Sequence, residues 1–258
     1  MHYREHANMH RFFLAKEILS NTEFNFPNDV AHQINAVLRL KSGDAVEVLD
    51  NEGGQFLVSL SHVSAEKVMG RVEKMQQIST EPHLHLSLCV SLTKREKFET
   101  ILQKATEIGV SAFVPFVSRH ALVRDAALSP ARMLRWRNIL KEAAEQSRRG
   151  LIPTLHEPQS LQNALVQAEQ SHDLCLIAYE SEQNHNLADV LPGLNERKKV
   201  KKIAVFIGPE GGFAESEVLL MRQKNVRTFS LGPRTLRMET AAIIVPALLL
   251  YLFDQMKI

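Results

Sequence analysis

From residue 84 to the end of the sequence, short uninterrupted apolar runs alternate with stretches of helical periodicity. Runs of this length suit strands that are buried on both faces, and the stretches between them suit crossover helices. Strands that alternate with helices form a mainly parallel sheet, so we predict an α/β fold for this part of the chain. The predicted strands are 84–92, 112–117, 174–179, 203–207 and 229–231, and the predicted helices are 96–108, 130–147, 215–224 and 239–255.

The first 78 residues show a different pattern, in which short strand-like runs are separated by tight turns. The runs at 11–14, 46–49, 55–60 and 67–72 surround a turn at 51–54, whose two glycines accept a positive φ. Asp29 is in position to cap a short helix among them. Several short strands with tight turns predict a small β-barrel. The polar segment 79–82 ends in a proline, so we place the domain boundary there and predict domains at 1–78 and 79–258.

The composition excludes several classes of protein. Apolar residues make up 45% and charged residues 23%, which argues against a disordered, collagen-like or disulfide-rich chain. Cys89 and Cys175 each lie in an apolar run, so we expect reduced, buried thiols and a cytoplasmic location. No spacing resembles a zinc site, and no metal is expected. The longest apolar run, 241–253, is too short to span a bilayer, so we expect no membrane partner.

The net charge of +2 hides an uneven distribution of charge. Residues 94–149 hold 12 Lys and Arg against 6 Asp and Glu, whereas residues 1–78 hold 8 against 10. Clustered cations of this kind are typical of a nucleic-acid-binding surface. A set of solvated helix faces would give the same composition, and both interpretations stay open at this point.

The sharpest local motif is Gly-Pro-Glu-Gly-Gly-Phe at 208–213, between a predicted buried strand and a predicted helix. Open α/β sheets bind ligands at the carboxyl ends of their strands, and glycines there let the backbone approach a ligand closely. The motif is neither G-x-G-x-x-G nor a P-loop, so dinucleotide binding and P-loop phosphate binding are unsupported. A tight turn without any ligand is the alternative.

A second Gly-Pro turn, at residues 232 and 233, leads from a short predicted strand into the last predicted helix. Arg234, Arg237 and Glu239 crowd this segment, which should lie beside the first loop. Glu239 and Thr240 could instead cap the helix, and the two roles are compatible.

Four segments together resemble a known family. These are Gln103–Val110, the helix end Glu142–Arg149, the loop at 208–212 and the segment at 231–241, in this order and at these separations. They are similar to the RsmE family, the bacterial 16S ribosomal RNA uridine-N3 methyltransferases of the SPOUT class. The likeness extends over nearly the whole chain from Met9, and Arg39 with Gly43-Asp44 matches the N-terminal part of the family.

The resemblance implies a fold and partners that the residue patterns do not show. It implies an N-terminal PUA-like β-barrel that binds RNA, and a C-terminal SPOUT α/β domain with a deep trefoil knot. It further implies a homodimer that uses S-adenosylmethionine and acts on 16S rRNA or the small ribosomal subunit. Two other functions stay open, namely a SPOUT enzyme acting on a ribose 2′-hydroxyl or on tRNA, and a non-catalytic RNA-binding protein of ribosome assembly.

The resemblance also implies site residues. The cofactor should lie among three loops, with its adenine against Leu231 and Leu236. The implied cofactor-binding residues are Ala178, Tyr179, Gly208, Pro209, Glu210, Gly211, Gly212, Leu231, Gly232, Leu236, Arg237, Met238 and Thr240. The candidate RNA-binding residues are Arg11, Arg39, Lys94, Arg95, Arg119, Arg148 and Arg149.

Methylation of uridine N3 requires loss of the N3 proton and support for the resulting anion. An arginine suits the anion and a carboxylate suits the proton, so the catalytic candidates are Arg237, before Arg234, with Glu239 and Glu210. Two residues depart from the family pattern. Met238 replaces a residue that is usually small and hydroxylated, and Pro246 should kink the last helix near Ala242.

Overall fold

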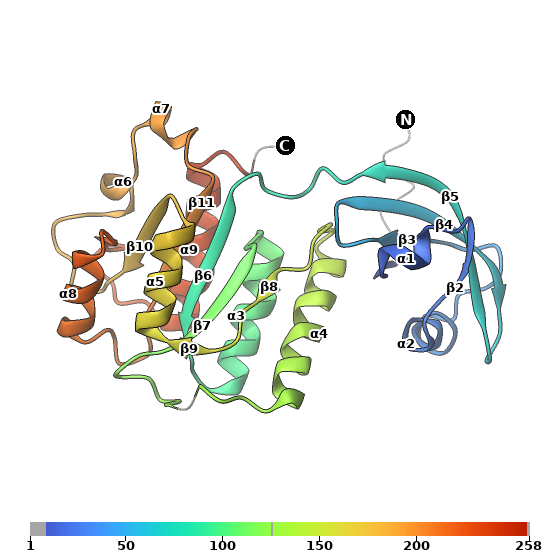
Figure 1. Cartoon of the computed structure of the whole chain (residues 1–258), viewed down its shortest axis with the longest axis horizontal. Helices are drawn as coiled ribbons and strands as arrows, with labels where there is room; N and C mark the ends of the chain where they lie inside the picture. The colour runs from blue at the N-terminus through green and yellow to red at the C-terminus, as the bar shows by residue number, and fades with distance from the viewer. Residues whose placement is uncertain (1–8, 125, 257–258) are drawn as a thin grey trace. The chain divides into compact units, whose positions relative to one another are not determined.

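The structure, a computed structural model, describes residues 9–124 and 126–256. It divides into two compact units, which are described separately. Unit 1 comprises the described part of Met1–Glu81 together with Ala144–Ile152, and unit 2 comprises Pro82–Ala143 and the described part of Pro153–Ile258. The sequence predicts a single boundary between residues 78 and 79. The structure instead has Ala144–Ile152 in unit 1, together with the N-terminal residues. Figure 1 shows the chain coloured from its N-terminus to its C-terminus.

Unit 1 contains one five-stranded sheet of order β1-β3-β4-β5-β2. β1 is parallel to β3, whereas the other neighbouring pairs are antiparallel. The turn predicted at 51–54 joins β3 to β4, and Asn51 and Gly53 there have φ of 59° and 101°. The strands are β1 Arg11–Phe13, β2 Glu23–Asn25, β3 Ala45–Leu49, β4 Gly54–Val63 and β5 Val68–Gln77.

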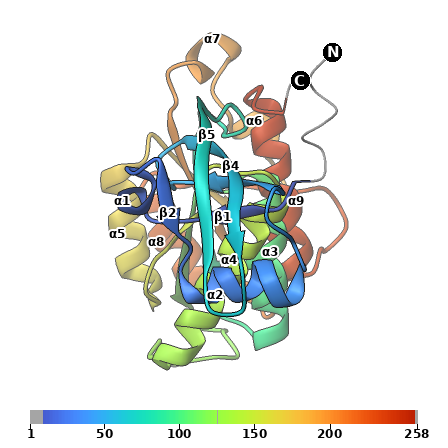
Figure 2. The same cartoon turned by 90° about the vertical axis from the view of Figure 1, so that its right-hand side faces the viewer.

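Short helices complete the hydrophobic core of unit 1. These are α1 Lys16–Leu19 and α2 Asn28–His32, and α2 continues into a π-helical turn at Gln33–Val37. Val30 and Ile34 are buried in one core with residues of β4 and β5, and Figure 2 faces this sheet with α2 beside one end of those strands. The expected cap at Asp29 is wrong, because Pro27 occupies the N-cap position and Asp29 lies inside the first turn.

The segment Ala144–Ile152 contributes a second, smaller core to unit 1. Ala144 is buried with Phe13 and Leu49, and Ile78 packs against the same cluster. The backbone N–H of Phe13 donates to Glu145, and the backbone N–H of Ile152 donates to the Asn51 side chain, at 3.0 and 2.7 Å. Packing and hydrogen bonds therefore hold this segment to the first 81 residues, which lie far from it in sequence.

Unit 2 confirms the predicted α/β fold. Its sheet has the order β12-β10-β11-β6-β7-β8, with β9 also paired to β7. Every one of these pairings is parallel. The strands are β6 His85–Ser91, β7 Ala112–Val117, β8 Thr154–Leu155, β9 Gln159–Ser160, β10 Leu174–Ala178, β11 Lys202–Ile207 and β12 Arg227–Phe229.

Helices cover both faces of this sheet (Figure 1). Residues of α5, Leu161–Ser171, and α8, Glu215–Gln223, share a core with the strand residues Cys89, Ile177 and Phe206. The remaining long helices are α3 Arg95–Ile108, α4 Pro130–Gln146 and α9 Met238–Leu252, with the short α6 Leu187–Val190 and α7 Leu194–Arg197. α9 contacts β6, β11 and α3. Within the described residues, no helix is both long and apolar enough to cross a membrane.

Some predicted elements differ in detail from the structure. The strand predicted at 229–231 is β12 at Arg227–Phe229, two residues earlier, because the edge strand includes the polar Arg227 and Thr228. The helix α5 and several short elements were not predicted. The last helix, predicted over 239–255, runs from Met238 to Leu252 with Pro246 inside it, and the kink expected near Ala242 stays a prediction. α3 ends at Ile108, the predicted end, and Gly109 forms its C-cap with φ of 119°.

Both cysteines are free, as predicted. Cys89 is buried in β6 and Cys175 is half-buried in β10. Burial raises the pKa of the Cys175 thiol to about 11 and raises the pKa of Cys89 as well. Neither thiol is therefore ionised near neutral pH, and neither is activated as a nucleophile.

Candidate functional site

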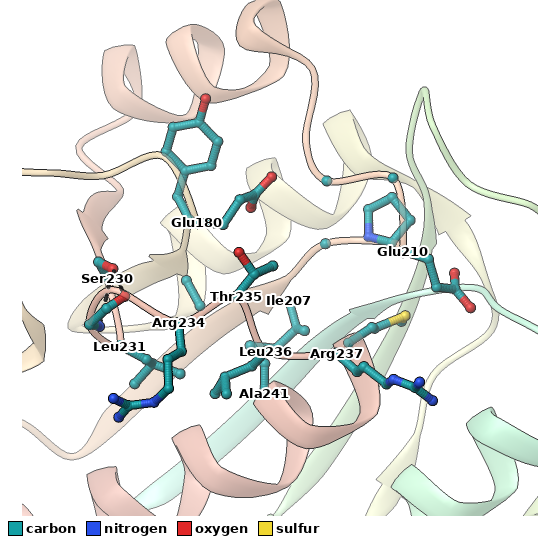
Figure 3. Close-up of a pocket in the computed structure, with 18 of the residues that line it drawn as sticks. Glu180, Ile207, Glu210, Ser230, Leu231, Arg234, Thr235, Leu236, Arg237 and Ala241 are labelled. Atoms are coloured by element: carbon teal, nitrogen blue, oxygen red, sulfur yellow. Dashed lines mark hydrogen bonds between the residues drawn. The ribbon is translucent and has the colours of Figure 1, made fainter.

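A cavity of about 550 Å³ lies at the carboxyl ends of three neighbouring strands of unit 2 (Figure 3). Ala178 ends β10, Ile207 ends β11, and Ser230 follows β12. Because parallel strands end at the same edge of a sheet, the loops that follow them meet around one space. The start of α9 closes the same space with Met238 and Ala241.

Glycines shape the loop at 208–212, and two of them could not be replaced without disturbance. Gly212 has φ of 71°, and a Cβ there would overlap the carboxylate of Glu180. A Cβ on Gly208 would lie 2.8 Å from the ring of Phe213. These positions therefore require a residue without a side chain, and the loop presents backbone to the cavity.

The cavity brings together twelve of the thirteen residues expected at a cofactor site. Those twelve are Ala178, Tyr179, Gly208, Pro209, Glu210, Gly211, Gly212, Leu231, Gly232, Leu236, Arg237 and Met238. Thr240 does not line the cavity and is exposed on the first turn of α9. The cofactor contact predicted for Thr240 therefore has no support from the cavity lining and stays a prediction.

Sequence reasoning missed other residues that line the cavity. They are Lys97, Glu180, Ile207, Ser230, Thr235 and Ala241, together with Arg234, for which the sequence predicts only a catalytic role. Glu180 lies two positions after the end of β10, and Ser230 lies one position after the end of β12. A prediction that included the first two residues after each strand would have found both. Lys97 comes from α3, and no local pattern in the sequence places it here.

Arg237 occupies the N-cap position of α9, in extended conformation and without a capping hydrogen bond from its side chain. The expected capping by Glu239 and Thr240 is wrong, because both residues lie within the first helical turn. Arg234 and Arg237 extend in different directions from their loop, and Arg237 extends on the side of Glu210 (Figure 3). Both arginines are exposed, and among the described residues neither guanidinium has a hydrogen-bond or ion-pair partner.

Four polar side chains form a connected group at one rim of the cavity. Thr93 donates a short hydrogen bond to Glu210, and the Lys97 ammonium donates to the same carboxylate at 3.1 Å. Lys97 also lies 3.4 Å from Glu239 Oε2, which is buried and accepts no hydrogen bond from the described residues. Glu210 lines the cavity. Glu239 does not line it, but is paired with Lys97, which does.

The charges in this group favour ionised carboxylates. Burial alone would raise the pKa of Glu210, but hydrogen bonds from Thr93, the backbone and Lys97 outweigh burial and lower it. The hydrogen bond to Glu210 in turn raises the pKa of Lys97. Near neutral pH, Glu210 is therefore an anion and Lys97 a cation.

The residues expected to bind RNA divide into two groups. Five of them are exposed, namely Arg39, Lys94, Arg95, Arg119 and Arg148. The other two, Arg11 and Arg149, are buried and paired with Glu47 and Glu81, both at 2.8 Å. A buried, paired guanidinium is withdrawn from a phosphate, so the structure corrects the expectation for both residues.

No group of His, Cys, Asp or Glu side chains in residues 9–124 and 126–256 could hold a metal ion. The polar groups of the cavity are instead backbone amides, hydroxyls, two carboxylates, one ammonium and two guanidiniums. Such a set suits an organic ligand with both polar and apolar parts.

Comparison with known proteins finds related sequences that match most of the chain. Residues 80–250 match the family model described as RNA methyltransferase domain. The ribosomal RNA small subunit methyltransferase E of Bacillus subtilis is 32% identical over 240 residues, which cover 91% of this chain and 93% of that relative.

Solved structures agree with this. The ribosomal RNA small subunit methyltransferase E of Neisseria gonorrhoeae, bound to S-adenosylmethionine, superposes with a TM-score of 0.84 at 25% identity. The match covers 95% of this chain and 98% of that one. A Legionella pneumophila structure, in complex with the same cofactor, gives a TM-score of 0.81 at 26% identity, again over 95% and 98% of the two chains.

Proposed function

This chain belongs to the ribosomal RNA small subunit methyltransferase E family, and we propose that it transfers a methyl group from S-adenosylmethionine to N3 of a uridine in 16S rRNA. One observation carries the proposal. The loops after β10, β11 and β12 form a single cavity with the start of α9, and two of the four segments by which the chain resembles the family, 208–212 and 231–241, lie at this cavity.

The cavity fits the cofactor in size and in chemistry. A volume of about 550 Å³ lies in the range of small-molecule sites. The backbone at Gly208 and Gly212 can approach a ligand closely, because no Cβ intervenes at either position. Leu231 and Leu236 offer apolar contacts for a purine ring, while Glu180 offers a hydrogen-bond acceptor for a hydroxyl or an ammonium. Bound S-adenosylmethionine supplies an electrophilic methyl group on its sulfonium.

The residues around the cavity can prepare the uracil. Arg237 carries a permanent positive charge that no side chain in residues 9–124 or 126–256 pairs with, so it can hold the uracil oxygens and stabilise the N3 anion. Glu210 lines the cavity as an ionised carboxylate and can accept the hydrogen bond and then the proton of N3. Glu239 is the second carboxylate of this rim. Positioning of the two reactants supplies roughly 7–11 kcal/mol of barrier reduction in favourable cases.

The family also suggests an assignment for the two parts of the chain. We propose that 1–78 forms a PUA-like β-barrel that binds RNA and that 79–258 forms a SPOUT methyltransferase domain with a deep trefoil knot. Homodimer formation is supported by an exposed apolar row on α9, where Ile244, Leu248 and Tyr251 follow one another at helical spacing. The expected site of action is the cytoplasm, on 16S rRNA or the small ribosomal subunit.

Two measurements test this function. Calorimetry with S-adenosylmethionine asks whether the cavity binds the cofactor. Incubation with cofactor and 16S rRNA or small subunits, followed by digestion to nucleosides and mass spectrometry, identifies the product. We expect 3-methyluridine. A 2′-O-methylated nucleoside, or methylation of tRNA alone, would assign the enzyme to another substrate, and absence of cofactor binding would leave a non-catalytic RNA-binding protein.

A further inference from the structure

Lys97 lines the cofactor cavity although it belongs to none of the loops that form it. It lies near the start of α3, with 34% of its side chain exposed. The next residue, Phe98, is fully buried and stacks on Trp136 of α4 with ring centroids 4.2 Å apart. Lys97 therefore projects from a helix whose backbone is fixed by packing.

The ammonium of Lys97 contacts two carboxylates that belong to different segments beside the cavity. Glu210 belongs to the loop after β11, and Glu239 lies directly after the loop that follows β12. The nitrogen of Lys97 is 3.1 Å from Glu210 Oε1 and 3.4 Å from Glu239 Oε2. One cation thus links two segments that α8 and β12 separate in sequence.

Removal of this cation would leave two neighbouring carboxylates without compensation. Thr93 would still donate to Glu210. Glu239 Oε2, by contrast, is buried without any hydrogen bond from the described residues, so Lys97 is its compensating charge. Like charges this close repel, and the two loops would be expected to separate.

An ordinary surface ion pair would have little effect, because exposed pairs contribute little to stability. Lys97 differs from such a pair in two respects. It serves two carboxylates at once, and these carboxylates belong to separate segments beside the cavity: Glu210 lines it directly, and Glu239 lies in the first turn of α9, whose Met238 and Ala241 line it. The effect of Lys97 should therefore appear in ligand binding and methyl transfer more than in global stability.

We propose that Lys97 is a positioning residue of the methyl-transfer site, whose ammonium holds the loop of Glu210 and the start of α9 together around the cofactor. This inference rests on the proposed function and deepens it. Lys97 acts through the two glutamates and takes no part in the transfer of the methyl group or of the proton.

The test compares Lys97→Met and Lys97→Arg with Lys104→Met. Lys104 lies on the same helix and pairs with Glu107 at 2.9 Å, so its replacement removes the same charge from the same basic segment without touching the cavity. Calorimetry gives the Kd for S-adenosylmethionine, single-turnover assays give the methylation rate, and melting curves give stability.

We expect Lys97→Met to weaken cofactor binding by about 10-fold and to slow methyl transfer by about 10- to 100-fold, with a nearly unchanged melting temperature. Lys97→Arg should restore most of both, and Lys104→Met should resemble the unmutated protein. Because Lys97 acts through the glutamates, adding Glu239→Gln or Glu210→Gln to Lys97→Met should cost less than the separate losses multiplied together.

The outcomes distinguish a failure of the proposed function from a failure of the proposed role of Lys97. If the unmutated chain binds no cofactor and methylates no RNA, the proposed function fails and the role of Lys97 fails with it. If the unmutated chain does both and Lys97→Met matches it, only the role of Lys97 is overturned. Equal losses in Lys97→Met and Lys104→Met, or losses that multiply fully in the double variants, would likewise overturn it.

Discussion

Arg149 donates to the carboxylate of Glu81 at 2.8 Å, and the two side chains are only 5% and 16% exposed. Glu81 also accepts the backbone N–H of Gly150 at 2.8 Å. The neighbouring Arg148, by contrast, is exposed and adopts a left-handed backbone with φ of 62°. Two adjacent arginines therefore have different surroundings, and two predictions separate them.

Arg149→Ala should reduce the free energy of unfolding by about 3–5 kcal/mol, because it leaves the charge of Glu81 buried without its partner. Urea unfolding measures this loss, with Arg148→Ala as the matched control, which should change stability little. If Arg149→Ala has normal stability and binds RNA more weakly, then Arg149 contacts RNA and the prediction is wrong.

Arg148→Ala should weaken RNA binding and reduce its dependence on salt. Each phosphate contact that is lost lowers the slope of log K against log salt concentration by about 0.7–0.9. Binding isotherms at several salt concentrations provide the slope, and cofactor affinity should not change. An unaltered slope would place Arg148 outside the RNA contact.

Gly212→Ala should abolish binding of S-adenosylmethionine in a folded protein. Its φ of 71° disfavours a side chain, and the new Cβ would displace the carboxylate of Glu180 from the cavity wall. Gly43→Ala is the control, because Gly43 has φ of 96° with nothing within 4 Å, so it introduces the backbone strain alone. Wild-type affinity in folded Gly212→Ala would show that this loop does not bind the cofactor.

The position of the cavity in unit 2 was predictable because the parts of this cavity follow a simple rule of sheet geometry. The runs that end at Ala178 and Ile207 are apolar enough to be strands buried on both faces, and the carboxyl ends of parallel strands share one edge. The glycines after Ile207 then identify where backbone meets ligand. Local pattern and global fold agree at these positions, so the sequence alone indicates them.

The same reasoning fails where a residue depends on a distant partner. Lys97 meets Glu210 across 113 positions of sequence, and Arg149 meets Glu81 across 68. A basic residue that is exposed and one that is buried against a carboxylate look alike in sequence, so the sequence wrongly predicts RNA contacts for Arg11 and Arg149. Local spacing carries no information about pairs that only the tertiary fold brings together.

Glu182 should make unit 2 sensitive to acid. Its carboxylate accepts from Thr228 at 2.6 Å, from the backbone of Asn184 at 2.9 Å and from Arg222 at 2.8 Å. The hydrogen bond from Thr228 contributes most to lowering the pKa of Glu182, from 4.5 to about 2. A lowered pKa contributes stability that is complete above pH 4.5 and is lost as the pH falls toward 2.

Glu182→Gln should therefore destabilise the protein at pH 7 and should flatten the fall in stability between pH 4.5 and about 2. Urea unfolding across this range measures the effect. Glu196→Gln is the control, since Glu196 pairs with Lys199 on the surface with 61% of its side chain exposed. A parallel pH dependence for Glu182→Gln and the unmutated protein would contradict the lowered pKa.

Arg237→Ala should slow single-turnover methylation by roughly 10²- to 10³-fold, the loss expected when one donor to a developing anion is removed. One competing role for Arg237 is a salt bridge with Glu239, but Glu239 is paired with Lys97 instead. The other competing role is a phosphate contact, whose loss would weaken RNA binding and leave the methylation rate normal at saturation.

The assay measures single-turnover methylation with saturating RNA and cofactor, and a melting curve measures stability. Arg234→Ala is the matched variant from the same loop. Because the Arg237 side chain makes no capping hydrogen bond to α9, stability should be unchanged. A near-normal rate in stable Arg237→Ala, with a slow Arg234→Ala, would transfer the role to Arg234.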